Sequence, residues 1–530
     1  MANSKTYSMH NRSVTINDPE GITAEECLKL AQLGRERWNE WRREFPAKNF
    51  ESKIANRANF RRCHFHSASL VNFFGFEFGD FADFSGTTFD TDMSFYGATF
   101  GKDASFVGAS FRGIANFEKS HFGDRTTFAR AKFFGYVTFS NSIFGADIQF
   151  SAAKFEGFSN FSRCQFGHFA DFDEAKFGPI ADFSAAIFRS VSFILSRFDR
   201  MAKFSGAMFG SADFERAEIG AFSSFSGETW DKLRSSFLDE AYFAKHQGEA
   251  KSYGLDPNAF GGLIFRGVKF SENVDFSERE FRGILDFGES KRKGESQSSP
   301  RGSAKKIPSC DDKGRLIFDQ DENIVFEERK FSSGIERTKF ISAPLFFGSK
   351  LTANTNFSGA IFPTASGNEK AANAYRVLKS AFAQQQAMRE EQRFYRLEMA
   401  EEAAGEMGHR RWLYRIYQLI SNFGFSLWRP VALLVATYLV SLVLYGMLAG
   451  LHVCVPWRMP CSLNADLIQF GLLQALPLPG FDKTIELLRL GLFSGANGLL
   501  LTLVVAAQKI LSLLALFLIG LALRNLFKMK

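Results

Sequence analysis

The sequence predicts a mainly β fold, built as a repeat solenoid and followed by a helical region that ends in two membrane spans. Three observations support this prediction. Phe accounts for 64 of the 530 residues, against 11 Tyr and 6 Trp. The Phe residues recur at spacings of 5 and 6, and two long apolar runs lie near the C-terminus. A chain of this length is expected to divide into several units rather than form one core.

The Phe ladder between residues 84 and 188 is the strongest signal. A spacing that alternates between 5 and 6 matches neither a helical face nor strand alternation. The backbone must therefore turn a corner once per unit, so that every Phe faces a common interior. The ladder consists of Phe84, Phe89, Phe95, Phe100, Phe106, Phe111, Phe117, Phe122, Phe128, Phe133, Phe139, Phe144, Phe150, Phe155, Phe161, Phe166, Phe172, Phe177, Phe183 and Phe188.

A small or β-branched residue stands two positions before most of these Phe residues, as at Ala98, Ala104 and Val137. A large side chain beside a small one fills an interior without voids. Burial of each Phe contributes roughly 1.5–3 kcal/mol, so the ladder should dominate the stability of this region. Ser, Gly, Asp and Asn between the Phe residues suit corners.

Three-residue units such as Ala115-Asn116-Phe117 and Ala181-Asp182-Phe183 recur along the ladder. In these units the chain resembles the pentapeptide-repeat family, with Phe where Leu is commoner. The resemblance implies a right-handed quadrilateral β-helix with one five-residue unit per side. The alternation of 5 and 6 departs from the family pattern and implies a bulged side. The resemblance covers 51–228 and returns at 260–288 and 317–365.

Residues 1–50 are expected to hold a helix that closes the open end of the solenoid. Thr23 and Glu26 form a capping-box pattern, and Trp38 and Trp41 belong to an apolar stripe, so one helix is predicted over 23–44. The stretch 34–42 resembles an element found ahead of pentapeptide repeats. Docking of a partner is the alternative role for this helix.

Three segments depart from the ladder. Residues 229–259 are predicted to contain a helical insertion, with its helix over 230–245. Residues 289–316 are rich in Ser, Lys and Arg and are expected to be a disordered basic linker, with contact to anionic lipid as the alternative. Over 366–428 the apolar period becomes helical, and the sequence resembles the cytoplasmic neck of membrane-bound pentapeptide-repeat proteins with two C-terminal spans.

Residues 429–530 are predicted to form the membrane domain, with spans at 431–451 and 499–523. Several Arg residues precede the first span and basic residues follow the second, so the positive-inside rule places both termini in the cytoplasm. The N-terminus has no apolar signal-peptide core. Together with the family resemblance, these features predict a multi-pass protein of the bacterial inner membrane.

The segment between the spans offers two further hypotheses. Cys454 and Cys461 fall on the outer side and are candidates for a disulfide. An apolar helix at 463–480, capped by Asn464, is either re-entrant or interfacial. If it is re-entrant, Pro477, Pro479 and the intramembrane Lys509 are candidate pore residues. In the alternative, the second span starts later and Lys509 extends to the interface.

No enzyme signature, cofactor motif or metal-ligand spacing is present, and Cys63, His64 and His66 are interpreted as solvent-facing. The main repeat region has 18 Lys and Arg against 20 Asp and Glu, which disfavours nucleic-acid binding and duplex-DNA mimicry alike. The expected function is a membrane-anchored scaffold that contacts membrane lipid and presents the solenoid to a cytoplasmic protein. The alternative is a homo-oligomeric ion channel gated by the solenoid.

Overall fold

The computed structural model divides into two compact units, Met1–Pro363 and Thr364–Lys530, and each is described by itself. The described residues are 5–9, 12–16, 22–46, 48–50, 53–55, 57–66, 72–237, 239–271, 274–292, 306–308, 326–328, 334–347, 349–351, 355–363, 369–424, 426–450, 464–476, 479–494 and 498–528.

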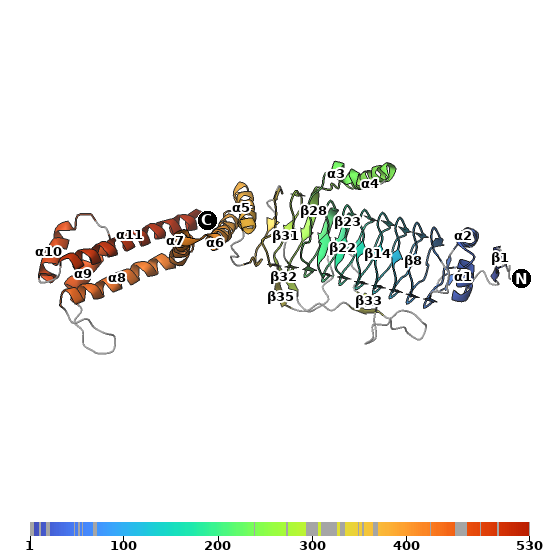
Figure 1. Ribbon diagram of the computed structural model, residues 1–530, viewed down its shortest axis with the longest axis horizontal. Coiled ribbons are helices and arrows are strands. Elements are labelled where there is room, and N and C mark those ends of the chain that lie inside the picture. The colour runs from blue at the N-terminus through green and yellow to red at the C-terminus, as the bar shows by residue number, and fades with distance from the viewer. Residues whose placement is uncertain are drawn as a thin grey trace. The chain divides into compact units, whose positions relative to one another are not determined.

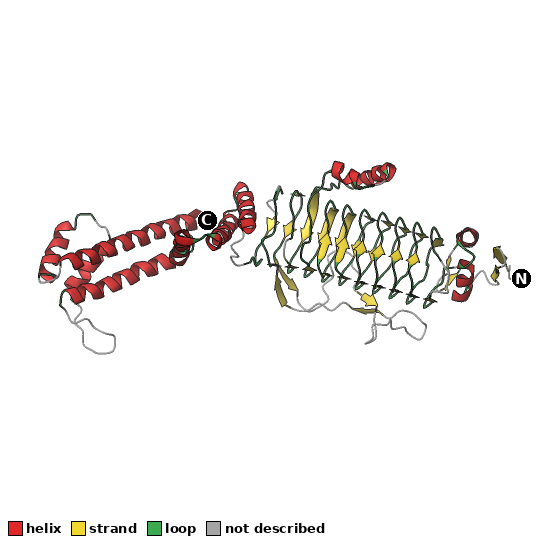
Figure 2. Ribbon diagram, in the orientation of Figure 1, coloured by secondary structure: helices red, strands yellow, loops and turns green. Residues whose placement is uncertain are grey.

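The first unit is a β-solenoid in which short parallel strands from successive coils pair into three sheets (Figures 1 and 2). The ten-stranded sheet runs in the order β36 (Lys339–Phe340), β29 (Lys269–Phe270), β27 (Glu218–Ile219), β24 (Arg197–Phe198), β21 (Lys176–Phe177), β17 (Lys154–Phe155), β13 (Lys132–Phe133), β10 (Ser110–Phe111), β7 (Thr88–Phe89) and β5 (His64–Phe65). The six-stranded sheet runs in the order β25 (Met201–Lys203), β22 (Ile180–Asp182), β18 (Ser159–Asn160), β14 (Val137–Thr138), β11 (Ala115–Asn116) and β8 (Met93–Ser94).

The third sheet has thirteen strands. Its main path is β37 (Thr355–Asn356), β31 (Leu285–Asp286), β28 (Ala259–Ile264), β26 (Met208–Asp213), β23 (Ile187–Ser192), β19 (Gln165–Phe166), β15 (Ile143–Phe144), β12 (His121–Phe122), β9 (Thr99–Phe100) and β6 (Glu77–Gly79), with β16 (Ile148–Gln149), β20 (Ala170–Asp171) and β30 (Glu280–Phe281) beside it.

Strand register shows how the Phe spacing builds the coil. Phe111 pairs with Phe133, and Phe177 pairs with Phe198, so each Phe meets the fourth Phe that follows it in the ladder. One coil therefore takes four Phe units, and the ladder residues are all buried. Their rings stack coil upon coil in four columns, with centroids 4.5 Å apart between Phe106 and Phe128. The inward ladder and the buried small residues beside it, such as Ala98, are as predicted.

The small residues of the ladder also satisfy buried backbone carbonyls. Ser120 Oγ donates to the Phe95 carbonyl at 2.7 Å, and Ser142 Oγ donates to the Phe117 carbonyl at 2.7 Å. Cys164 Sγ takes the equivalent place on the Phe139 carbonyl at 2.9 Å. Each of these carbonyls also accepts from a backbone amide, so Ser or Cys at these corners adds a second hydrogen bond to the turn.

Both interruptions of the ladder leave the columns in register. Helices α3 (Trp230–Ser235) and α4 (Glu240–Ser252) lie between strands that still pair Phe209 with Phe260. The second interruption lies between Phe270 and its partner Phe340. The structure divides the predicted single helix of the first insertion in two.

Within the range expected to be a disordered linker, two short strands are present. Strand β32 (Glu289–Arg292) pairs with β35 (Gly334–Arg337), and β33 (Lys306–Pro308) pairs with β34 (Phe326–Glu328), both antiparallel. The remainder of 289–316 lies outside the described residues.

The N-terminal segment holds two helices instead of the single one predicted over 23–44. Helix α1 (Ala24–Ala31) begins at the expected capping box of Thr23 and Glu26, and α2 (Arg35–Glu44) follows. The break falls at Gly34, whose φ of 92° lies in a region that glycine adopts readily. Two antiparallel pairs flank the helices, β1 (Lys5–Met9) with β2 (Arg12–Ile16) and β3 (Lys48–Phe50) with β4 (Lys53–Ala55).

The second unit is helical (Figure 2). Its helices are α5 (Glu369–Gln384), α6 (Met388–Gly405), α7 (Gly408–Ser421), α8 (Trp428–Leu448), α9 (Ala465–Ala475), α10 (Asp482–Leu492) and α11 (Gly498–Lys528). Two stretches, Trp428–Leu448 and Gly498–Asn525, are long and apolar enough to cross a membrane. Helix α9 begins at the predicted cap, where Asn464 Oδ1 accepts from the Asp466 amide at 2.9 Å. Helix α10 was not expected from the sequence.

Candidate interaction surface

A row of apolar side chains follows one edge of the six-stranded sheet on the outside of the solenoid. We call Ile114, Tyr136, Phe158, Ile180, Met201 and Phe222 the apolar row. Each occupies the same place in successive coils, as the hydrogen bond from the Ala115 amide to the Tyr136 carbonyl and the Ile180–Met201 pairing show. The rings of Tyr136 and Phe158 are in contact, with their centroids 5.2 Å apart.

The apolar row is accessible, although large apolar side chains are usually covered in a folded protein. Ile114 is 44% exposed and Phe222 is 53% exposed, and the members between them are half-buried. Phe134, in the turn just before Tyr136, is 43% exposed. Apolar surface is therefore continuous along about six coils, or roughly 24 Å at the spacing of paired strands.

A row of cations runs beside it on the ten-stranded sheet. Lys132 pairs in register with Lys154, Lys154 with Lys176, and Lys176 with Arg197, so that four cations stand on successive coils. We call these four residues the basic row. Arg197 is bound by Asp199 at 2.8 Å and Glu218 at 3.4 Å, whereas no ion pair joins Lys154 or Lys176 to an acid in the described part of the chain. This row concentrates positive charge within a region that is nearly neutral overall.

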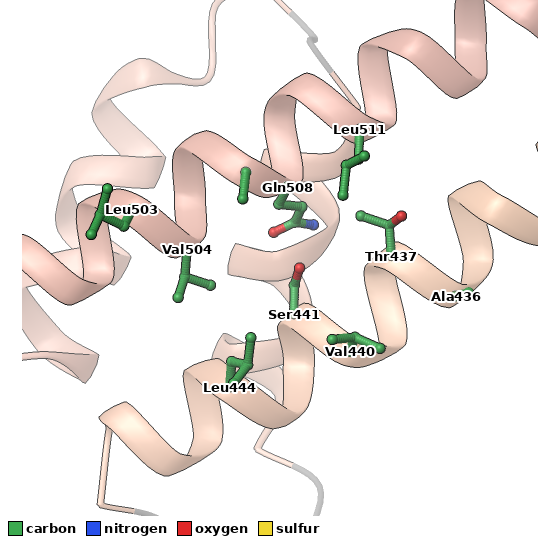
Figure 3. A pocket seen from close by; sticks show the side chains of 10 residues that line it. Ala436, Thr437, Val440, Ser441, Leu444, Leu503, Val504, Gln508 and Leu511 are labelled. Carbon is green, nitrogen blue, oxygen red and sulfur yellow. The ribbon is translucent and has the colours of Figure 1, made fainter. Parts of the chain in front are cut away.

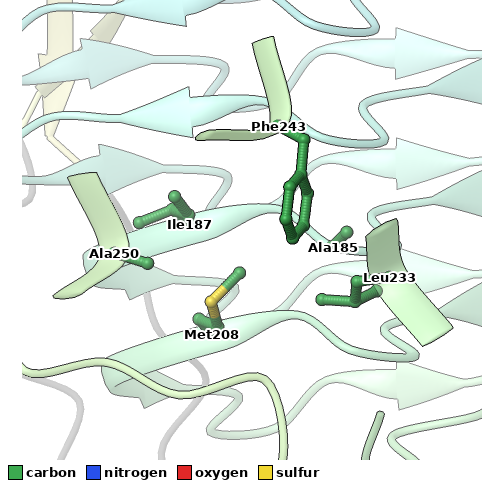
Figure 4. Packing of buried hydrophobic residues seen from close by; sticks show 6 residues of the cluster. All are labelled: Ala185, Ile187, Met208, Leu233, Phe243 and Ala250. Carbon is green, nitrogen blue, oxygen red and sulfur yellow. The ribbon is translucent and has the colours of Figure 1, made fainter. Parts of the chain in front are cut away.

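Helices α3 and α4 cover a different side of the solenoid. Leu233, Phe243 and Ala250 pack on Ile187 and Met208 (Figure 4). The Tyr242 hydroxyl donates to the Asn141 carbonyl, and Arg163 Nη1 donates to the Ser236 carbonyl at 3.3 Å. The apolar row is left uncovered by this helix pair.

His246, on the inner face of α4, is completely buried. Its Nε2 lies 2.9 Å from the Ala185 carbonyl, and its Nδ1 lies 3.4 Å from Gln165 Nε2. These partners fit a neutral ring that donates from Nε2 and accepts at Nδ1. Burial lowers the pKa of His246 to about 4, with a smaller contribution from the charge of Arg163, although the hydrogen bond to the Ala185 carbonyl opposes this shift.

Arg279 occupies a ladder position where the other coils have a small residue. It is fully buried and donates to three backbone carbonyls: Nε to Phe225 at 2.8 Å, Nη2 to Phe204 at 3.1 Å, and Nη1 to Pro257. Its guanidinium also lies over the Phe260 ring at 3.8 Å. Burial lowers the pKa of Arg279 to about 9. This residue fills the corner from which the helical insertion leaves the solenoid.

In the second unit, a polar cluster holds α9 against α8 and α11. The Tyr445 hydroxyl donates to Gln508 Oε1 at 2.6 Å, and Gln508 Nε2 donates to the Gly471 carbonyl at 2.8 Å. Apolar contacts of Phe470 with Tyr445 and Phe493 surround this cluster. Helix α9 is thus hydrogen-bonded to α11 through Gln508, and to α8 through Tyr438, whose hydroxyl donates to the Ile468 carbonyl at 3.4 Å.

A groove of about 440 Å³ runs between α8 and α11. Its walls are mostly aliphatic, and Thr437, Ser441 and Gln508 are directed into it (Figure 3). Of the predicted pore residues, Lys509 and Pro479 do not line this groove. Lys509 is exposed on the outer side of α11, Pro479 is exposed beyond the end of α9, and Pro477 lies outside the described residues.

Cys454 and Cys461 lie outside the described residues. Cys63 is a half-buried free thiol, and His64 and His66 are exposed, with His64 paired to Asp90. Among the described residues, no three His, Cys, Asp or Glu side chains are placed to hold a metal ion.

Comparisons with protein-family models, with curated proteins and with solved structures each returned no match for this chain.

The apolar row and the basic row were not anticipated from the sequence. A signal was available, because positions that lie one coil apart fall on one line along the solenoid. Writing the sequence with one coil of four Phe units to a line brings Ile114, Tyr136 and Phe158 together. Arg279, by contrast, interrupts the pattern of small residues, and only the structure shows which carbonyls it contacts.

Proposed function

We propose that this chain is a membrane-anchored pentapeptide-repeat scaffold of the bacterial inner membrane, which presents its solenoid to a protein partner in the cytoplasm. The four Phe units per coil support a quadrilateral form, the resemblance to pentapeptide repeats implies a right-handed one, and α1 and α2 act as its N-terminal cap. Trp38 supports the cap, because its Nε1 donates to the Glu77 carbonyl at 2.8 Å and its ring packs on Phe60 and Phe76 of the first coil. The two long apolar helices supply the anchor.

The observation that carries this proposal is the apolar row beside the basic row. A rigid line of exposed Ile, Tyr, Phe and Met side chains suits the hydrophobic centre of an interface, and aromatic residues are enriched in such centres. The flanking Lys154 and Lys176 favour a partner with acidic groups next to its apolar contacts. We infer that the partner is an acidic, partly apolar protein segment that lies along the solenoid.

Photo-crosslinking from single positions in the cells that produce the protein tests this. A photoreactive amino acid at Phe158, in the apolar row, is expected to give a discrete adduct, whereas one at the exposed His168 on another side gives none. Lys154→Glu with Lys176→Glu should reduce the Phe158 adduct about tenfold or more, through charge repulsion. Equal adducts at both positions, or none at Phe158, would contradict the scaffold function.

Ion conduction is the second candidate, because α9 is bonded to both apolar helices in the manner expected of a re-entrant segment. Purified full-length protein in liposomes tests it by ion flux. If the channel function holds, Lys509→Leu, or Pro477→Ala with Pro479→Ala, changes the flux. Absence of flux from inserted protein rules out conduction and leaves the scaffold.

A further inference from the structure

Helix α7 has an apolar face that nothing in the described part of the second unit covers. Trp412, Leu413, Ile416 and Leu419 are 66%, 64%, 45% and 74% exposed. At about 100° per residue these four side chains share one face of the helix. We call them the outer face of α7. A helix of this length is only marginally stable alone in water, and most of its stability comes from packing of its apolar face. An apolar face of this size therefore indicates a surface that covers it.

The opposite face of α7 is the one that packs against the protein. Ser421 is its one buried residue among those described. The Tyr417 ring contacts Phe423 at 5.7 Å, and Ser421 Oγ donates to the Tyr417 carbonyl. Tyr417 and Ser421 are four residues apart and lie away from Trp412 on the helical wheel. The outer face is therefore directed away from the rest of the unit.

Cations border the outer face. Arg410, Arg411 and Arg415 are all exposed, and α7 contains no acidic residue. Arg410 approaches Glu406 at 4.0 Å, while no ion pair joins Arg411 or Arg415 to an acid in the described ranges. An apolar face bordered by Arg is the composition of helices that lie in the headgroup region of anionic membranes.

The position of α7 in the chain selects the membrane over other occupants. After Ser421 the chain makes a tight turn, with Asn422 and Phe423 at φ 48° and 57°, and α8 begins at Trp428. Arg429 Nη1 donates to the Gln418 carbonyl at 2.7 Å, which fixes the end of α7 to the start of α8. If α8 crosses a bilayer, the outer face of α7 therefore lies close to the bilayer surface, at a distance of about one or two helical turns.

We propose that α7 is an interfacial helix that binds anionic phospholipid, with its outer face among the acyl chains and Arg411 and Arg415 on the lipid phosphates. This inference rests on the proposed membrane anchoring. The arginines bind the phosphates as charge-assisted hydrogen-bond donors. Anionic lipid then holds the start of α8 at a defined depth.

Depth-dependent fluorescence quenching of full-length protein in phosphatidylcholine vesicles with about a quarter phosphatidylglycerol tests the proposal. A fluorophore is attached at Trp412→Cys on the outer face, at Gln418→Cys on the exposed polar side of α7, or at Leu439→Cys on α8. Unsubstituted protein, labelled in parallel, gives the signal from the native cysteines. Lipids spin-labelled near the head of the acyl chain or near its middle serve as quenchers, with iodide for water.

The Trp412→Cys label is expected to be quenched by the shallow lipid label, the Leu439→Cys label by the deep one, and the Gln418→Cys label by iodide. Adding Arg411→Gln and Arg415→Gln to Trp412→Cys should reduce shallow quenching about threefold or more with phosphatidylglycerol present, and have little effect in phosphatidylcholine alone.

Three other results would overturn the inference. Deep quenching at Leu439→Cys with iodide quenching at Trp412→Cys leaves the anchor intact and refutes the interfacial helix. Protection of the Trp412→Cys label from both quenchers, with crosslinks between protomers, assigns the outer face to a second copy of the chain. Absence of lipid quenching at Leu439→Cys refutes the anchor itself.

Discussion

Each Phe of the ladder makes contacts along the solenoid and across it. Phe150 stacks on Phe128 at 4.9 Å and on Phe172 at 4.8 Å, and it meets Phe139 and Phe161 edge-on at 5.6 and 5.4 Å. A flat ring satisfies both directions at once, because offset stacking and edge-on contact are the favoured arrangements of aromatic pairs. This geometry explains why one aromatic residue type dominates the composition.

Replacing Phe150 by Asp is expected to destabilise the solenoid by at least about 3–5 kcal/mol, which is the cost of losing a buried Phe. The buried carboxylate, which has no partner, adds to this cost. Thermal unfolding followed by circular dichroism, with limited proteolysis, measures the effect. Phe134→Asp is the matched control, since its side chain is 43% exposed and should lower stability by less than about 1 kcal/mol. Equal protease resistance of Phe150→Asp and the wild type would contradict the inward ladder.

Arg279 stabilises the solenoid through hydrogen bonds that only it can provide. Arg279→Met keeps the apolar bulk but removes three hydrogen bonds, although the Phe204 and Pro257 carbonyls still accept from the amides of Ala207 and Glu228. The expected cost is about 1–3 kcal/mol, chiefly from the Phe225 carbonyl. We expect a clear fall in the denaturation midpoint. Arg282→Met is the control, because its side chain is 51% exposed and pairs with the exposed Glu280 at 3.2 Å. Equal midpoints for the two variants would show that the three hydrogen bonds add no stability.

The docking of α3 and α4 on the solenoid is stable only while His246 is neutral. Its pKa is lowered from 6.5 to about 4 in the docked state, chiefly by burial, so the undocked state binds a proton more readily. Docking is fully stable above pH 6.5 and loses stability as the pH falls from 6.5 towards 4, by up to about 3 kcal/mol.

Hydrogen exchange of 240–252, corrected for the pH dependence of the intrinsic rate, checks this. Protection should fall between pH 6.5 and about 4 in the wild type and in the exposed-site control His168→Gln. In His246→Leu, which cannot titrate, protection should be independent of pH over that interval. A pH-dependent loss that persists in His246→Leu would assign the effect to another group.

Local patterns in the sequence predicted the elements that depend on them. The Phe ladder, the capping box at Thr23 and the Asn464 cap of α9 are each set by residues close together in the chain. The break at Gly34 was missed because a glycine inside an amphipathic pattern is compatible with either one helix or two.

Features that depend on contacts between coils could not be predicted in the same way. The packing of α4 on Ile187 and the three carbonyls at Arg279 depend on how the inserted segment meets the coils. The bonds of Gln508 to Tyr445 and Gly471 likewise join helices that are distant in the sequence. A propensity argument treats each segment alone, and tertiary contacts decide these arrangements.

For the whole solenoid, deletions of one coil and of half a coil should affect stability alike but affect partner binding differently. Deleting residues 140–161 removes one complete coil and keeps the remaining members of the apolar row in line. Deleting 140–150 removes half a coil. The second deletion preserves the alternation of 5 and 6 and stacks Phe on Phe, but it moves Ile180 and Met201 to the opposite side from Ile114 and Tyr136.

Both deletions are therefore expected to unfold cooperatively at similar temperatures. A photoreactive residue at Tyr136 should still capture the partner in the full-coil deletion and lose most of the adduct in the half-coil deletion. If the two deletions capture the partner equally, binding does not follow the apolar row.

The insertion helices have a consequence for how the solenoid responds to tension. They contact Asn141, Arg163, Ala185 and Met208, which belong to four successive coils. A stack pulled from one end should release its coils one at a time, each lengthening the chain by roughly 75 Å. The coils under α3 and α4 are joined to one another by this helix pair, so they should unfold at a higher force. They should then unfold together, in one larger extension step. The helix pair would then limit extension under load in a solenoid that otherwise unfolds one coil at a time.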